Sequence, residues 1–186
     1  MADSIKHDVI SWLNRVVIGL NLCPFSAQPV HNKQVRFQVS EAKDEESVLA
    51  DLALEMEFLD RTPVTEIETT LLIIPYALQD FHDYNQCVIW AQSRLKKQGW
   101  QGVYQLASFH PHYCFAGADP DDDENLTNRA PYPIIHIIRE ASLEKALHYF
   151  KDVEGIPVRN KVCVENLSTE QKQRLFPYLF ADNSGE

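Results

Sequence analysis

The sequence has little positive charge. Lys and Arg number 17 against 27 Asp and Glu, which gives a formal net charge of −10 at pH 7 over 186 residues. Such a balance repels nucleic acid and anionic membrane surfaces unless a local basic patch overrides it, and no cluster of Lys and Arg of that kind occurs. We therefore expect neither nucleic acid nor a membrane among the partners.

Cysteines are also few, and no long apolar run is present near the start of the chain. The four cysteines, Cys23, Cys87, Cys114 and Cys163, are widely spaced and form no C-x-x-C pair. This spacing is unlike a disulfide framework or a zinc knuckle, so we interpret them as reduced thiols. Charged residues interrupt every apolar stretch of "MADSIKHDVISWLNRVVIGLNLCPF", unlike a signal peptide or a membrane span. The sequence predicts a soluble protein of the cytoplasm.

Apolar spacing and capping residues predict alternating strands and helices. A first helix is expected behind Asp3 or Ser4, ending at about Gly19. Strands are expected at 35–40, 68–76, 103–109 and 132–140, and helices behind the caps Asp44, Asp80, Ser142 and Ser168. Ser168 and Gln171 have the spacing of a capping box, and "IPVRNKVCVENL", 156–167, favours helix over strand.

This order of elements predicts one α+β domain over 1–180, with a frayed tail at 181–186. We expect a mixed four-stranded sheet with helices packed on it and a ferredoxin-like tendency. A three-layer α/β fold with a parallel, doubly wound sheet is the alternative.

The segment "FHPHYCFAGADPDDDENLTNR", 109–129, joins the third and fourth strands and is rich in polar side chains. If the third strand continues past Phe109, its period of two sends His110, His112 and Cys114 to one face. A His-x-His pair can hold a divalent transition metal or act in acid–base catalysis, with His136 on the next strand as the third member. The alternatives are a surface turn for the pair and a hydrogen-bonded core histidine for His136.

Several further side chains are not required by local structure and could bind a ligand. Arg129 and Arg139 could clamp a carboxylate or a phosphate, whereas the alternative for Arg129 is a salt bridge to the acids of 121–124. Cys23 follows a helix end, which favours a structural thiol over a nucleophile. The candidate ligand-binding residues are Asn125, Asn128, Arg129, Arg139, Arg159, Asn160 and Cys23.

Two structural expectations follow for these candidates. The acids of 121–124 should form an exposed, mobile turn that binds no metal, because adjacent carboxylates repel one another when buried. Arg139 and His136 should belong to one polar cluster with Asn128 and Arg129 above it, provided that the fourth strand ends near Ile138.

Four motifs give the chain a resemblance to a known family. They are "GLNLCPF", "FHPHYCF", "NLTNRAPYPIIHIIRE" and "IPVRN", and they extend over most of the sequence. In these motifs the chain resembles an uncharacterised bacterial family classified only as a domain of unknown function. The resemblance implies no activity, cofactor or catalytic residue.

Three functional hypotheses remain open on the sequence alone. The first is a soluble enzyme that acts on a small anionic metabolite, with His110 and His112 as metal ligands or acid–base groups and Arg129 and Arg139 on the anion. The second is a non-catalytic small-ligand-binding or regulatory domain in which the same polar residues recognise a ligand. The third is an assembly protein whose 109–129 loop docks a partner.

Overall fold

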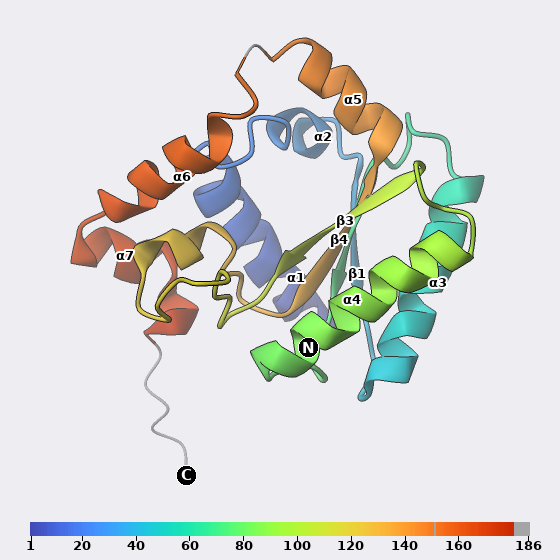
Figure 1. The fold of residues 1–186 in the computed structure, drawn as a ribbon, viewed down its shortest axis with the longest axis horizontal. Helices are drawn as coiled ribbons and strands as arrows, with labels where there is room; N and C mark the ends of the chain where they lie inside the picture. Colours follow the sequence, from blue (N-terminus) through green and yellow to red (C-terminus); the bar gives the residue numbers. More distant parts are fainter. Residues whose placement is uncertain (151, 181–186) are drawn as a thin grey trace.

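The computed structural model describes residues 1–150 and 152–180, and within them the strands form one mixed four-stranded sheet (Figure 1). The strands are β1 (Val35–Val39), β2 (Thr69–Ile73), β3 (Tyr104–Phe109) and β4 (Ile134–Arg139), in the order β1-β2-β4-β3. β1 and β2 are parallel, and β4 is antiparallel to both of its neighbours. The predicted α+β class with a mixed four-stranded sheet is confirmed.

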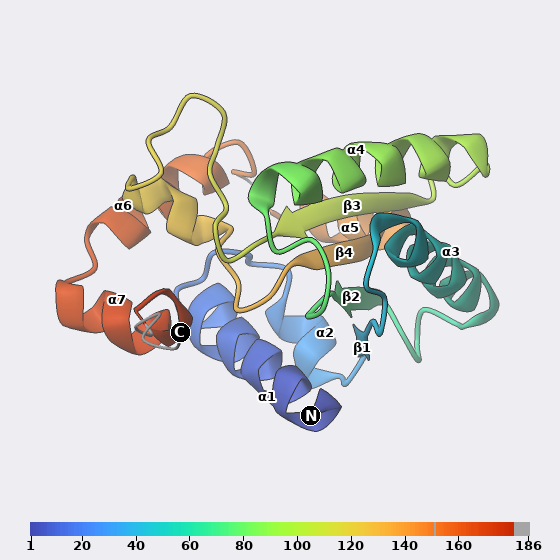
Figure 2. The ribbon, with the colours of Figure 1, turned by 90° about the horizontal axis from the view of Figure 1, so that it is seen from below.

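Helices cover both faces of the sheet. They are α1 (Ala2–Trp12), the π-helical η1 (Leu13–Ile18), α2 (Ala27–His31), α3 (Glu45–Arg61), α4 (Phe81–Lys97), the 3-10 helix η2 (Asp123–Thr127), α5 (Glu140–His148), α6 (Ile156–Glu165), α7 (Thr169–Leu175) and the 3-10 helix η3 (Pro177–Leu179). Figure 2 shows α3 and α4 on one face, α1 and α2 on the other, and α6 and α7 toward one end. Among the described residues, no helix is long and apolar enough to cross a membrane.

The position of β4 explains the ferredoxin-like tendency of the sheet. β4 lies between the parallel strands β2 and β3, which makes β2-α4-β3 a split β-α-β unit. The order along the chain is β-α-β-α-β-β, whereas the ferredoxin-like order is β-α-β-β-α-β. Both crossovers move in the same direction across the sheet, so right-handed connections place α3 and α4 on one face.

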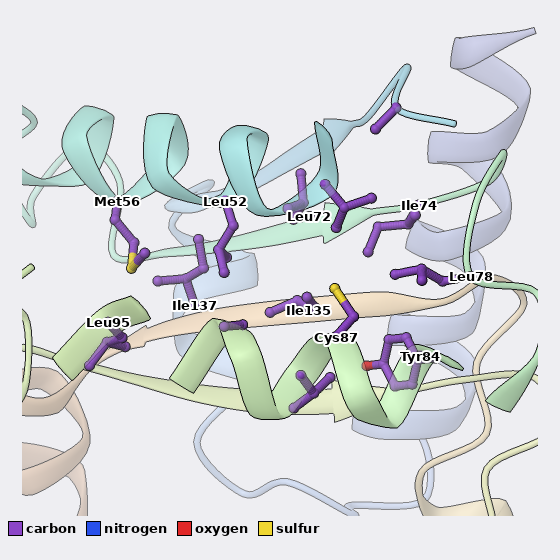
Figure 3. Packing of buried hydrophobic residues seen from close by; sticks show 14 of the residues in the cluster. Leu52, Met56, Leu72, Ile74, Leu78, Tyr84, Cys87, Leu95, Ile135 and Ile137 are labelled. Carbon is purple, nitrogen blue, oxygen red and sulfur yellow. The ribbon is translucent and has the colours of Figure 1, made fainter. Parts of the chain in front are cut away.

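The core beneath α3 and α4 is made by alternate strand residues. Leu72 of β2 and Ile135 and Ile137 of β4 point toward these helices (Figure 3). Leu52 and Met56 of α3 meet them, and all five side chains are buried. The alternation of side chains that the sequence predicts for these strands therefore explains which residues face α3 and α4.

A second core lies between the opposite face of the sheet and α1. Leu71 and Ile73 of β2 and Ile134 of β4 pack in one cluster with Val9 and Trp12 of α1. The cluster extends to α6, α7 and the 3-10 segments at the end of the sheet, through Val164, Phe176, Leu126 and Ala130. The C-terminal helices therefore belong to the same core as the N-terminal helix.

Most predicted helix starts are confirmed by cap geometry. Asp44 accepts a hydrogen bond from the Ser47 amide at 2.8 Å, and Asp80 accepts one from the His82 amide at 2.8 Å. Ser168 forms the predicted capping box of α7. The predicted caps Asp3 or Ser4 and Ser142 are wrong, because α1 begins at Ala2 and α5 begins at Glu140, directly after β4.

Two further boundaries differ from the expectation or fall outside the description. Helical structure ends at Ile18, next to the expected Gly19, but its last six residues are a π-helix. The tail expected at 181–186 lies outside the described residues.

Candidate functional site

His110 is a core residue rather than part of an open site. β3 ends at Phe109, and the His110 side chain is fully buried against the rings of Phe81 and Tyr84 of α4. Its Nε2 donates to the Leu78 carbonyl at 3.0 Å, and its Nδ1 accepts from the His112 amide at 3.0 Å. Burial lowers the pKa of His110 to about 4, so the imidazole is neutral at pH 7. Both nitrogens already have protein partners.

His136 lies on the opposite face of the sheet. It is paired with Leu71 of β2, whose side chain packs in the core beside α1. Its Nε2 lies 2.6 Å from the Thr69 hydroxyl, which donates its proton to the Ile137 carbonyl, so Nε2 is the donor to Thr69. Burial lowers the pKa of His136 to about 4. The sequence left His136 open as a site residue or a hydrogen-bonded core histidine, and its position in the structure is that of the core histidine.

The structure does not bring the three candidate histidines together. β3 stops before Pro111, so the expected alternation through His112 and Cys114 does not occur, and His112 is exposed in the turn that follows. His110 and His136 are separated by the sheet. Among the described residues, no group of three His, Cys, Asp or Glu side chains could hold a metal ion. The predicted three-histidine metal site is therefore not formed.

The two candidate asparagines hold the loop that contains them. Asn125 is fully buried, accepts from the Phe115 amide at 3.0 Å and donates to the Asp119 carbonyl at 2.8 Å. Asn128 donates to the Ser108 carbonyl at 3.1 Å, which fixes the loop to the end of β3. These amides use their hydrogen-bonding capacity within the protein, because backbone groups buried in a loop need partners.

Arg129 also serves this loop. Its Nε donates to the Tyr113 carbonyl at 3.2 Å and its Nη2 to the Pro120 carbonyl at 2.6 Å. Burial lowers the pKa of Arg129 from its ordinary value. Within the part of the chain that the structure describes, no carboxylate lies within salt-bridge distance of Arg129, so the alternative pairing with 121–124 is not formed.

The acidic run divides into two parts. Asp121 and Asp122 are exposed, as predicted for the turn. Asp123 and Glu124 are half-buried at the start of η2 and pair with Lys172 of α7 at 2.6 Å and Lys161 of α6 at 2.5 Å. The expectation of one exposed turn is therefore wrong for the last two acids, which fasten the loop to the C-terminal helices.

Arg139 caps the end of α3 and does not reach His136. β4 continues through Arg139, whose side chain points to the face occupied by α3. Its Nη2 donates to the carbonyls of Leu59 at 2.6 Å and Thr62 at 2.7 Å. A cation at a helix C-terminus is favoured by the helix dipole. The predicted cluster of Arg139 and His136 is not formed, because the two side chains lie on opposite faces of β4.

A cavity lies where the motifs "GLNLCPF" and "IPVRN" meet. Asn160 of α6 donates to the Leu22 carbonyl at 2.7 Å across 138 residues of sequence, and Figure 1 shows α6 beside the segment that leads into α2. The cavity has a volume of about 420 Å³. It is lined by Asn21, Pro24, Tyr149, Phe150, Asp152, Ile156, Arg159 and Asn160.

Arg159 is the cationic side chain among the described residues that line this cavity. Its Nη1 lies 2.5 Å from Asp152 Oδ2, its Nη2 donates to the Asp152 carbonyl at 3.1 Å, and its guanidinium lies 5.9 Å from the centre of the Phe150 ring. A Cβ at Gly155 would meet the ends of both side chains of the ion pair, which would have to move to admit it. The side chains of Arg159 and Asp152 are 49% and 67% exposed, and a ligand can therefore reach them.

The remaining walls combine carboxamides with aromatic rings. Asn21 has a positive φ of 53°, a conformation that asparagine tolerates better than most residues. Tyr149 is 79% exposed, and Phe150 packs edge-on against Phe25 with ring centres 5.5 Å apart. Polar or charged residues make up half of the lining, and the volume of the cavity lies within the range that is usual for small-ligand sites.

Of the predicted ligand residues, Arg159 and Asn160 line this cavity. Cys23 lies in the sequence between Asn21 and Pro24, which also line it. Burial raises the pKa of the Cys23 thiol, which fits the structural reading of this residue. Sequence reasoning missed Tyr149, Phe150 and Asp152, which precede α6 and form no motif.

Comparison with known proteins gives one family and no other match. The family model described as "Protein of unknown function (DUF1415)" matches residues 4–174. Neither the curated proteins nor the solved structures contain a match to the chain. Since the family model covers most of the sequence, the chain belongs to this family of proteins of unknown function, DUF1415.

Proposed function

We propose that the protein binds a small anionic molecule in the cavity between the 21–24 segment and α6, as a non-catalytic ligand-binding domain. The observation that carries the proposal is the convergence of two distant motifs on one cavity that presents Arg159 beside Asn160. The volume of about 420 Å³ falls in the range of roughly 300–1,000 Å³ that is usual for small-molecule sites. An acidic protein must bind an anion through such a local cation.

Binding is favoured over catalysis by the residues that line the cavity. The candidate acid–base residues His110, His112 and His136 are not among them. Asp152 is, but its carboxylate is engaged by Arg159 and by the Gly155 amide at 3.1 Å. The described lining thus offers groups that hold a molecule, and its carboxylate is already paired.

The compartment and the partner form part of the same proposal. Cys23, Cys87, Cys114 and Cys163 are all free, as expected for a protein of the reducing cytoplasm. A small anionic metabolite is the partner that the cavity supports. A divalent metal is not part of the proposal.

The experiment is a ligand screen with a charge-matched control. A panel of small carboxylates and phosphates is tested by ligand-observed NMR against the wild type, Arg159→Gln and Arg61→Gln. Arg61 is an exposed arginine in an ion pair with Glu57 on α3, so its variant makes the same change of charge elsewhere. We expect Arg159→Gln to weaken the best ligand about tenfold or more, because hydrogen bonds to charged groups contribute about 1.5–3 kcal/mol.

The control should bind as the wild type does. If no anion binds, or if Arg159→Gln binds as tightly as Arg61→Gln, the proposed function is wrong. Both arginines are exposed, so neither substitution should unfold the protein.

A further inference from the structure

We propose that the ligand of this cavity is a planar aromatic monocarboxylate with a polar ring substituent, an inference that rests on the proposed function. Three features of the cavity support it: the charge balance at Arg159, the exposed aromatic wall, and the pair of carboxamides. Each restricts a different part of the ligand.

The carboxylate of Asp152 beside Arg159 favours a ligand with one negative charge over a ligand with two. Among the described residues that line the cavity, Arg159 and Asp152 carry charge, and they form an ion pair. A guanidinium has five N–H donors, and contacts to Asp152 occupy two of them, so one edge can still bind a carboxylate. A phosphate monoester, with a second pKa near 6, is close to dianionic at neutral pH and would be repelled more strongly by the neighbouring Asp152 carboxylate.

The aromatic wall favours a flat ring. Tyr149 is 79% exposed although it borders the cavity, and Phe150 beside it is half-buried. Pro24 and Ile156 complete the apolar part of the lining. An aromatic ligand placed against Tyr149 would remove this apolar surface from water and add an aromatic pair interaction that a saturated ring cannot make.

The carboxamides favour a hydroxyl or amino group on that ring. Asn160 is held in place by its bond to the Leu22 carbonyl, which leaves its Oδ1 and one N–H for a ligand. Asn21 borders the same cavity and is exposed. Each amide presents a donor and an acceptor, so a substituent that can both donate and accept meets a partner in either orientation.

The test compares three probes by isothermal titration calorimetry at pH 7.5. They are 4-hydroxybenzoate, its saturated analogue 4-hydroxycyclohexanecarboxylate, and phenyl phosphate. We expect 4-hydroxybenzoate to bind about two- to twelvefold more tightly than the saturated analogue, the range that an aromatic pair interaction provides, and also more tightly than phenyl phosphate. Tyr149→Ala should remove the preference for the aromatic ring, and Arg159→Gln should weaken both carboxylates.

Ile89→Ala is the control for Tyr149→Ala, because it also shortens an exposed apolar side chain, on α4, and should leave the preference unchanged. Equal binding of the two carboxylates, or tighter binding of phenyl phosphate, overturns the inference and leaves the proposed anion site standing. If none of the three probes binds, the inference is likewise overturned, and the proposed function is then decided by the wider panel of anions.

Discussion

Replacement of Arg139 by Met should destabilise the fold without affecting the proposed ligand site. Arg139 Nη2 donates to the carbonyls of Leu59 and Thr62, at 2.6 and 2.7 Å, where α3 ends. Hydrogen bonds to a charged group contribute about 1.5–3 kcal/mol each, and a cation at a helix C-terminus adds about 0.3–1 kcal/mol. Water can rehydrate part of this half-buried region after the substitution, so we expect a net loss of about 2–4 kcal/mol.

Urea denaturation at pH 7 measures this loss. Arg61→Met is the matched control, because Arg61 lies in the last turn of the same helix but is exposed and forms an ion pair with Glu57. Its loss should stay below about 0.5 kcal/mol, the value of an exposed i,i+4 pair. A loss below about 1 kcal/mol for Arg139→Met, or a loss equal to that of the control, would refute the capping role of Arg139.

Three further predictions concern a core histidine, the loop and the cavity. The folded-state pKa of His136 is lowered to about 4, so its contribution to stability is present above about pH 6.5 and is lost toward pH 4; in urea titrations His136→Phe should flatten this dependence by about 1.4 kcal/mol per pH unit. Asn125→Ala leaves buried backbone groups of the loop without partners and should cost about 2–3 kcal/mol in urea unfolding, whereas the exposed Asn166→Ala should cost less than about 1 kcal/mol. Gly155→Ala should displace Arg159 and weaken anion binding in calorimetry, with little change in melting temperature.

Local chemistry explains why much of the fold could be predicted. The caps Asp44 and Asp80 act within three residues of themselves, and the buried strand β2 appears in the sequence as a continuous apolar run. Such signals do not depend on the rest of the chain. The expectation that His110, His112 and Cys114 share one face of a strand was wrong, because β3 ends at Phe109, before Pro111. Side chains alternate between two faces only within a strand.

The roles of the loop residues could not be predicted from their types. Asn125 and Arg129 are suited to bind a ligand, but their partners are backbone carbonyls and amides of the loop itself. A backbone group has the same chemistry in every residue, so the sequence gives no sign of which carbonyl will face a given side chain. For the same reason, the contact of Arg139 with the backbone carbonyls at the end of α3 could not be predicted.

Only some of the residues that line the cavity could be singled out from the sequence. The motifs that contain Asn21 and Asn160 could be singled out, but their meeting depends on a contact across 138 residues. Tyr149 and Phe150 had no distinguishing pattern, because a pair of aromatic residues after a helix is equally typical of a core. Placement by the tertiary structure is what makes them walls of a cavity.

The central claim is that the anion site lies at this cavity and not in the 109–129 loop. The most direct measurement is a map of backbone amide chemical-shift changes in the uniformly ¹⁵N-labelled protein, titrated with the tightest-binding anion of the panel. We predict that the largest changes fall together in 19–25 and 152–160, and that in Arg159→Gln they require about tenfold more ligand or are lost. Changes confined to 109–129, or changes that persist unaltered in Arg159→Gln, would contradict this account.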